Sequence, residues 1–133
     1  MANQKDNKTT IKDFEYFVER CRHWQEVFQL RSWGIIYQHE DEKDDEDLAE
    51  AKAIVMFAGY GDLVATVVLN KSWGHVPVTR NGLDRCALHE VLEIFLRGFY
   101  YFAACRFSVT DDDLEVEKHR IIRTIENILT DDD

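Results

Sequence analysis

The stretch ALHEVLEIFL, residues 87–96, holds side chains whose types and spacing could do chemistry. His89 and Glu93 lie four positions apart, so on a helix they share a face and could bind one metal ion. Glu90 lies about 100° round the helix, beside that ion, where zinc peptidases of the HExxH type hold their general base. A carboxylate can ligate zinc as an imidazole does, so Glu93 is compatible with a metal site.

The same residues also allow a purely structural interpretation. Glu93 and Arg97 form an i,i+4 pair of favourable polarity, and His89 could be a histidine satisfied within the core. A metal site would need a third protein ligand from another element. An argument against the structural interpretation is that charged residues in an otherwise apolar helix are costly to bury and need partners. Both interpretations stay open at this point.

Composition and charge limit the classes of function. The chain has 133 residues, of which 45% are hydrophobic, and this suits a single domain, 1–133, with an ordered core over about 10–130. A formal net charge of −10 disfavours phosphate contacts, so we expect no direct nucleic-acid binding, whereas a basic protein partner is compatible. Three cysteines without a CxxC pair, a polar start and no long apolar stretch lead us to expect a cytoplasmic protein without membrane association.

Periodicity predicts the elements that must position the HE residues. Residues 10–30 repeat apolar side chains at three- and four-residue steps, which predicts an amphipathic helix capped by Thr9 or Thr10. The acidic run within 40–48 is expected to be an exposed loop, and the acidic tail 130–133 extends the negative surface. Three strands, the last two joined by a turn at GYGD, are predicted where β-branched and aromatic residues gather: 32–40, 51–57 and 63–69.

Two helices are predicted after the strands. Residues 83–106 should form the HE helix, with Asp84 as its cap, and apolar residues on almost every side predict that it is central and buried. Residues 112–129 should form the last helix, whose leading aspartates suit the helix dipole. Its expected inner face consists of Ile121, Ile122, Ile125, Ile128 and Leu129. The sequence therefore predicts an α+β domain with the order helix, three strands, helix, helix.

This order, carried by FVERCRHWQEVFQLRSWGIIY, VATVVLN, ALHEVLEIFL and EKHRIIRTIENIL, resembles a family of small zincin-like metallopeptidases. These are mostly phage or prophage proteins, more distantly similar to SprT-type domains, and the resemblance covers residues 11–129. It implies a minimal zincin-like fold with an N-terminal helix, a small three-stranded sheet, a buried HE helix and a closing C-terminal helix. It also implies a phage-encoded protein that works in the cytoplasm of the host cell.

The resemblance also implies roles for single residues. His89 matches the first metal-binding histidine and Glu90 the catalytic base, whereas Glu93 stands where the second metal-binding histidine belongs. The closing helix of such proteins is expected to supply a third ligand, for which the candidates in this chain are Glu115, Glu117 and His119. Zinc is the cofactor that a working site would hold, and a degenerate site would hold none.

Lys118 is a second departure from a working site. The apolar positions of the closing helix centre near its direction, with Glu115 and Glu117 on either side. A lysine at the middle of an inner face should be buried, snorkel or be paired. A Glu93–Lys118 ion pair could then occupy the space of the metal ion, in a scaffold that has been kept for binding.

Two further regions are candidates for contacts. Trp73 and His75, in SWGHVP, could border a cleft beside the HE helix, or they are ordinary packing and surface residues. The run FYYFAACRF is expected to be core, with Tyr100 or Tyr101 on an exposed patch that could serve a homodimer.

Three functions follow from these observations. The first, which we favour because positions 93 and 118 depart together, is a degenerate zincin-like protein that binds a host or phage protein. The second is an active zinc-dependent peptidase, with zinc on His89, Glu93 and a closing-helix residue and with Glu90 deprotonating the bound water. The third is an acidic protein that mimics nucleic acid and inhibits a basic protein.

Overall fold

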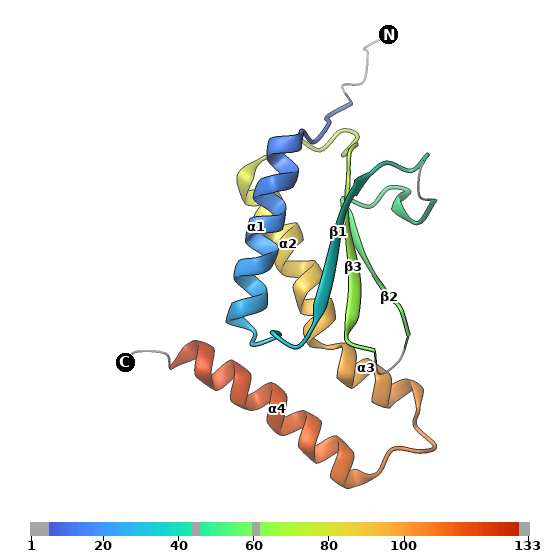
Figure 1. Ribbon diagram of the computed structural model, residues 1–133, viewed down its shortest axis with the longest axis vertical. Coiled ribbons are helices and arrows are strands. Elements are labelled where there is room, and N and C mark those ends of the chain that lie inside the picture. The colour runs from blue at the N-terminus through green and yellow to red at the C-terminus, as the bar shows by residue number, and fades with distance from the viewer. Residues whose placement is uncertain (1–5, 44–45, 60–61, 131–133) are drawn as a thin grey trace.

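A computed structural model describes residues 6–43, 46–59 and 62–130. Its elements in chain order are α1 (Ile11–Val27), β1 (Gly34–Glu40), the short 3-10 helix η1 (Glu46–Leu48), β2 (Ala53–Phe57), β3 (Val64–Asn70), α2 (Arg80–Phe95), α3 (Arg97–Ala104) and α4 (Asp111–Leu129). Helices α1 and α2 lie side by side against one face of the sheet, and α4 crosses below them (Figure 1). The structure confirms the predicted α+β class, and the order of the elements agrees except that two helices, α2 and α3, stand where one was predicted and that η1 was not predicted.

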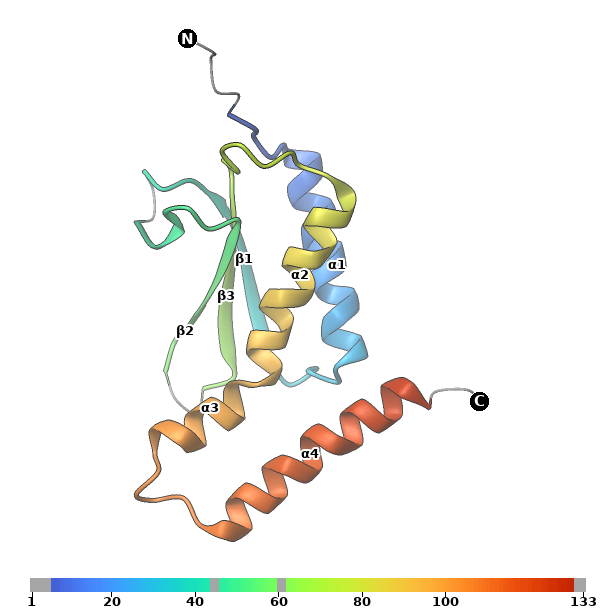
Figure 2. The same ribbon diagram turned by 180° about the vertical axis from the view of Figure 1, so that it is seen from behind.

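The sheet has the strand order β1-β3-β2. Strand β1 pairs parallel with β3, and β2 pairs antiparallel with β3. The central strand carries the fully buried Val67, Val68 and Leu69. All three predicted strands are present, while Tyr60 and Gly61 of the predicted GYGD turn lie outside the described residues. Seen from behind, both helices still lie on the same side of the sheet (Figure 2).

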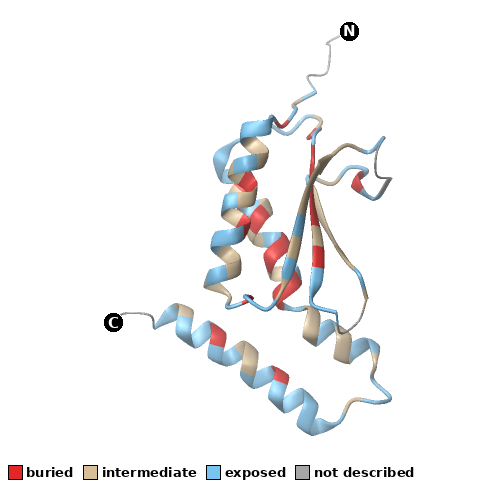
Figure 3. Ribbon diagram, in the orientation of Figure 1, coloured by how far each residue is buried: buried red, intermediate tan, exposed pale blue. Residues whose placement is uncertain are grey.

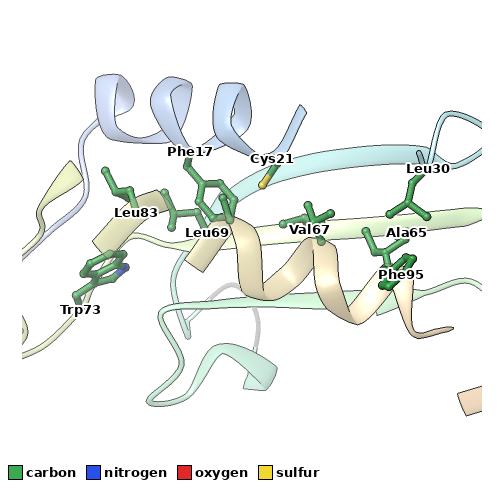
Figure 4. Packing of buried hydrophobic residues seen from close by; sticks show 12 residues of the cluster. Phe17, Cys21, Leu30, Ala65, Val67, Leu69, Trp73, Leu83 and Phe95 are labelled. Carbon is green, nitrogen blue, oxygen red and sulfur yellow. The ribbon is translucent and has the colours of Figure 1, made fainter. Parts of the chain in front are cut away.

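The core lies between this sheet face and the helix pair (Figure 4). Phe17 and Cys21 of α1 meet the central strand and α2, and both are fully buried. Complete burial of a side chain such as Phe17 contributes about 2 kcal/mol. Helix α1 begins at the expected residue, because Thr10 and Asp13 form a reciprocal capping box.

Helix α2 begins earlier than predicted, and its cap is a different residue. Thr79, whose side chain accepts a hydrogen bond from the Gly82 N–H, caps the helix. Asp84 instead accepts hydrogen bonds from Arg20 Nε at 2.8 Å and Trp24 Nε1 at 2.9 Å, both on α1. The prediction of Asp84 as the cap was therefore wrong, and this carboxylate joins α1 to α2.

The predicted single helix over 83–106 was also wrong, because it breaks at Leu96 into α2 and α3. Helix α3 has no buried residue, and Phe99 and Tyr100 are exposed. Helix α2 is buried on one side only. Leu83, Ala87, Glu90, Val91 and Ile94 lie on the inner side, while His89 and Glu93 are exposed.

The last helix shows a different inner face from the predicted one. In α4 the buried residues are Glu117 and Thr124, and Ile121 and Ile128 are half-buried (Figure 3). Three of the five residues predicted to face inward are exposed: Ile122, Ile125 and Leu129. Apolar periodicity alone placed the inner face wrongly, since the two residues that α4 buries are polar and apolar periodicity does not detect them.

The acidic loop is partly anchored to the sheet. Leu48 of η1, at the end of the acidic loop, is fully buried, while Asp47 beside it is exposed. Asp44 and Asp45 of this loop, and the tail residues 131–133, lie outside the described residues. Within the described residues no helix combines the length and the apolar character that a membrane crossing requires.

Candidate functional site

His89 and Glu93 lie on the outer face of α2, one turn apart. The distance from His89 Nε2 to Glu93 Oε1 is 3.7 Å, and the two side chains are 70% and 53% exposed. The spacing thus places both residues on one face, as predicted. Both groups point into solvent, however, and an exposed pair of this kind contributes little to stability.

Glu90 lies about 100° round the same helix from His89, on its inner side. It is only 6% exposed. Burial, and to a smaller extent the charge of Glu93, raises the pKa of Glu90 from 4.5 to about 7. Near neutral pH this carboxyl group is therefore present in both its protonated and its charged form, which is a property of many general bases.

Cys86 lies one turn before Glu90 on α2. Burial raises the pKa of the Cys86 thiol, Lys52 acts in the opposite direction, and Glu90 adds to the increase. A thiol with a raised pKa is mostly protonated at neutral pH and is a weak nucleophile and metal ligand.

The carboxylate of Glu117, on the closing helix α4, pairs with an arginine side chain of the same helix. Arg120 donates to its carboxylate from Nε, at 3.0 Å, and from Nη2. The same guanidinium donates to the Phe95 carbonyl oxygen at 2.7 Å and lies over the Phe95 ring. A Cβ added at Gly98 would lie 2.9 Å from Glu117 Oε1. We call this cluster of Phe95, Gly98, Glu117 and Arg120 the α4 joint.

The remaining candidates of the closing helix pair with one another. Lys118 Nζ lies 2.9 Å from Glu115 Oε1, and the Lys118 side chain is 57% exposed. His119 Nδ1 lies 2.7 Å from the Glu115 carbonyl oxygen. The hypothesis of a Glu93–Lys118 ion pair is corrected by this geometry, because the partner of Lys118 is on its own helix.

Two of the proposed metal ligands, His89 and Glu93, lie together, but no third ligand joins them in the described structure. His89 and Glu93 face solvent, Glu90 faces the interior and Glu117 is engaged by Arg120. Within residues 6–43, 46–59 and 62–130, no group of three or more His, Cys, Asp or Glu side chains is arranged to hold a metal ion. The third ligand that a zincin-type centre requires is therefore not in place among the described residues.

The cleft candidates also lie apart from the HE residues. Trp73 is buried, with its ring against Gly82 and with Lys52 Nζ 5.4 Å from the ring centroid. It borders a hollow of about 510 Å³ beyond the last residues of β1 and β3. The hollow is lined by neither His89, Glu90 nor Glu93. His75 is exposed and does not line it.

One feature of the structure was not predicted from the sequence, and a second was predicted only at Tyr100 or Tyr101. The first is the α4 joint; its one sequence signal is Gly98, an isolated glycine within a helical pattern, which often marks a close approach. The second is the concentration of exposed large hydrophobic side chains between residues 96 and 129, which holds more than half of those in the described chain. Phe107, at 93% exposure, is the most accessible of them.

No protein-family model, curated protein or solved structure matches this chain.

Proposed function

We propose that the chain is a protein-binding domain with a zincin-like order of elements, in which the HE helix does not work as a peptidase centre. The observation that carries the proposal is the divergence of the candidate groups: His89 and Glu93 point outward, and Glu90 inward. Glu117, the buried acidic residue of the closing helix, already has Arg120 as its partner. A metal would have to displace that arginine before it gained a third ligand.

The exposed hydrophobic residues of the C-terminal region support a protein-binding role. A monomer rarely exposes a large contiguous apolar patch unless the patch serves an interaction. Here the exposed residues follow α3, the connecting segment and α4, away from the buried core (Figure 3). We propose that this region binds a protein of the host or of the phage that encodes the chain.

A zinc titration followed by calorimetry tests the proposal. We expect no stoichiometric binding by the wild-type protein or by His89→Ala. The matched control is His75→Ala, which removes another exposed histidine, in the segment that precedes α2. About one zinc per chain, lost in His89→Ala and kept in His75→Ala, would overturn the proposal and restore the peptidase.

One observation favours the alternative of an active zinc-dependent peptidase. The pKa of Glu90 is raised to about 7, where a general base is effective. If this alternative holds, the protein cleaves casein in the presence of zinc, and Glu90→Gln abolishes the cleavage while far-UV circular dichroism shows that it still folds. Absence of cleavage by the zinc-loaded wild type argues against it.

A further inference from the structure

Helix α4 carries a second row of side chains that the body of the protein does not cover. We define the α4 row as Leu114, Lys118, Ile122, Ile125 and Leu129. These positions recur at steps of three and four, so they form one stripe along the helix. The stripe is distinct from the side that carries the buried Glu117 and Thr124.

Exposure confirms that the row faces solvent. Ile122 and Ile125 are each 42% exposed, Leu114 is 45% and Leu129 is 77%. Lys118 interrupts the row, but its ammonium group turns to Glu115, so its aliphatic stem adds to the apolar surface. The row runs from Leu114 to Leu129, which is 15 helical steps, and is therefore about 22 Å long, the length of four helical turns.

The charges at both ends of α4 indicate which partner fits. Asp111 and Asp112 are exposed at its N-terminal end, and Glu126 is exposed near its C-terminal end. In the sequence Thr130 is followed by three more aspartates, and the whole chain has a net charge of −10. A partner that carries basic residues beside its apolar ones complements both features of this surface.

The same charges disfavour a second copy of this chain. The row is centred between residues 121 and 122, so a two-fold antiparallel pairing would set Leu114 against Leu129 of the second copy. That pairing would also bring the aspartates at the start of one α4 to the acidic end of the other. A parallel pairing would align like charges along the whole helix.

We propose that the α4 row is the docking surface for a basic amphipathic helix of another protein. This inference rests on the proposed function and adds to it the chemistry of the partner. An apolar stripe of four turns, accessible along its length, matches the i, i+3, i+4, i+7 contacts by which one amphipathic helix packs on another surface. The acidic ends of α4 hold the basic flanks of that helix and set its position along the row.

The test uses a labelled 15-residue peptide of leucine and lysine, with the leucines at helical spacing, and measures fluorescence anisotropy with the full chain. We expect saturable binding at moderate salt. Ile122→Ser combined with Ile125→Ser should weaken it about tenfold or more, since two apolar contacts are lost. The matched control is Val116→Ser, which removes an exposed apolar residue of the same helix outside the row. This control should change the affinity less than about twofold.

Charge is tested separately. Asp112→Asn combined with Glu126→Gln should weaken binding about three- to tenfold and reduce its salt dependence. The control pair Glu15→Gln and Glu19→Gln removes the same charge from exposed positions of α1 and should have a smaller effect. A peptide in which glutamate replaces every lysine should not bind.

Three outcomes overturn the inference. They are no binding of the leucine–lysine peptide, equal binding by the Ile122/Ile125 variant, and a dimer in light scattering that this variant converts to monomer. The single change Leu129→Ser, at the end of the helix, repeats the test if the double variant fails to fold. Zinc binding that depends on His89 would overturn the proposed function instead, and failure of peptide binding without zinc binding would overturn only the α4 row.

Discussion

The carboxyl group of Glu90 is almost completely buried in the folded protein. Its pKa is about 7 in the folded chain, against an ordinary value of 4.5. Because the folded state holds this proton more tightly, unfolding becomes easier as the pH rises through the window from 4.5 to about 7. The stability that the protonated form provides is fully present below pH 4.5 and is lost above pH 7.

We therefore predict that Glu90→Gln is more stable than the wild type above pH 7 and similar to it near pH 4.5. The difference at about pH 8 should be up to roughly 3 kcal/mol, the equivalent of the shift in pKa. Urea unfolding at a series of pH values measures it, and all other titrating groups cancel between the two proteins. Glu93→Gln, at an exposed position of the same helix, should show a much smaller difference. A constant difference between Glu90→Gln and wild type at all pH values would contradict the prediction.

Sequence spacing predicted that His89 lies beside Glu93, but it did not predict that Glu90 faces the interior. Residues four apart on a helix must share a face, so the placement of His89 beside Glu93 needed no tertiary information. The direction in which α2 presents Glu90 depends on how α1 and the sheet pack against it. Asp84, tied to Arg20 and Trp24 of α1, fixes that rotation, and these partners lie about 60 residues away in the chain.

At the scale of elements, Arg120 connects α4 to the end of α2. It pairs with the buried Glu117 and also satisfies the Phe95 carbonyl oxygen. We predict that Arg120→Met loosens α4 by about 2 kcal/mol. This is less than the roughly 3–5 kcal/mol for a fully buried pair, because the Arg120 side chain is 38% exposed. The rate of trypsin cleavage after Arg123 should rise accordingly.

The combination with Glu117→Gln separates the ion pair from simple packing. Removal of Arg120 alone leaves a buried charge without its partner, whereas removal of both leaves a neutral amide. The double variant should therefore be cleaved more slowly than Arg120→Met alone. Equal or faster cleavage of the double variant would show that the Glu117 charge has no part in holding α4.

Gly98 provides a second prediction about the same joint. In an open helix, Gly→Ala stabilises by about 1 kcal/mol. At Gly98 the new Cβ would lie 2.9 Å from Glu117 Oε1, and Arg120 holds that carboxylate in place. We predict no gain in free energy of unfolding for Gly98→Ala in the wild type, but a gain of about 0.5–1 kcal/mol in a Glu117→Ala background. Thermal unfolding of the four proteins of this cycle measures the difference, and equal effects in both backgrounds would contradict it.

The break between α2 and α3 could not be predicted from the local sequence. The residues that lead up to Leu96 are apolar and Arg97 is a good helix former, which is why the range 83–106 was expected to be one element. The break leaves the Phe95 carbonyl oxygen to Arg120, 25 residues further along. Such a contact depends on where α4 docks. By contrast, the strands and the Thr10 cap were predicted correctly, because their signals are local.

At the scale of the whole molecule, the chain consists of a well-packed body and a helix attached to it mainly at one joint. The body joins α1, α2 and the sheet through fully buried residues such as Phe17, Val67 and Ala87. Helix α4 buries only Glu117 and Thr124. Its far end borders a hollow with the end of α1, lined by Glu26, Val27, Gln29, Asn127 and Ile128. This arrangement leaves the α4 row accessible.

The last prediction follows from that division. A segment with few buried apolar contacts opens at a lower free energy than the core does. We expect native-state hydrogen exchange to show α4 amides exchanging through a partial opening, while the amides of Val67 and Leu69 in β3 exchange only through global unfolding. The two classes should differ by at least about 2 kcal/mol in free energy of opening.

The substitution Arg120→Met should lower the protection of α4 amides and leave that of β3 amides nearly unchanged. The leucine–lysine peptide should raise protection in α4 if the row is its site. Exchange of α4 and β3 with one common free energy would instead mean that α4 is part of the core, and the row would then lie on a rigid surface of a single cooperative unit.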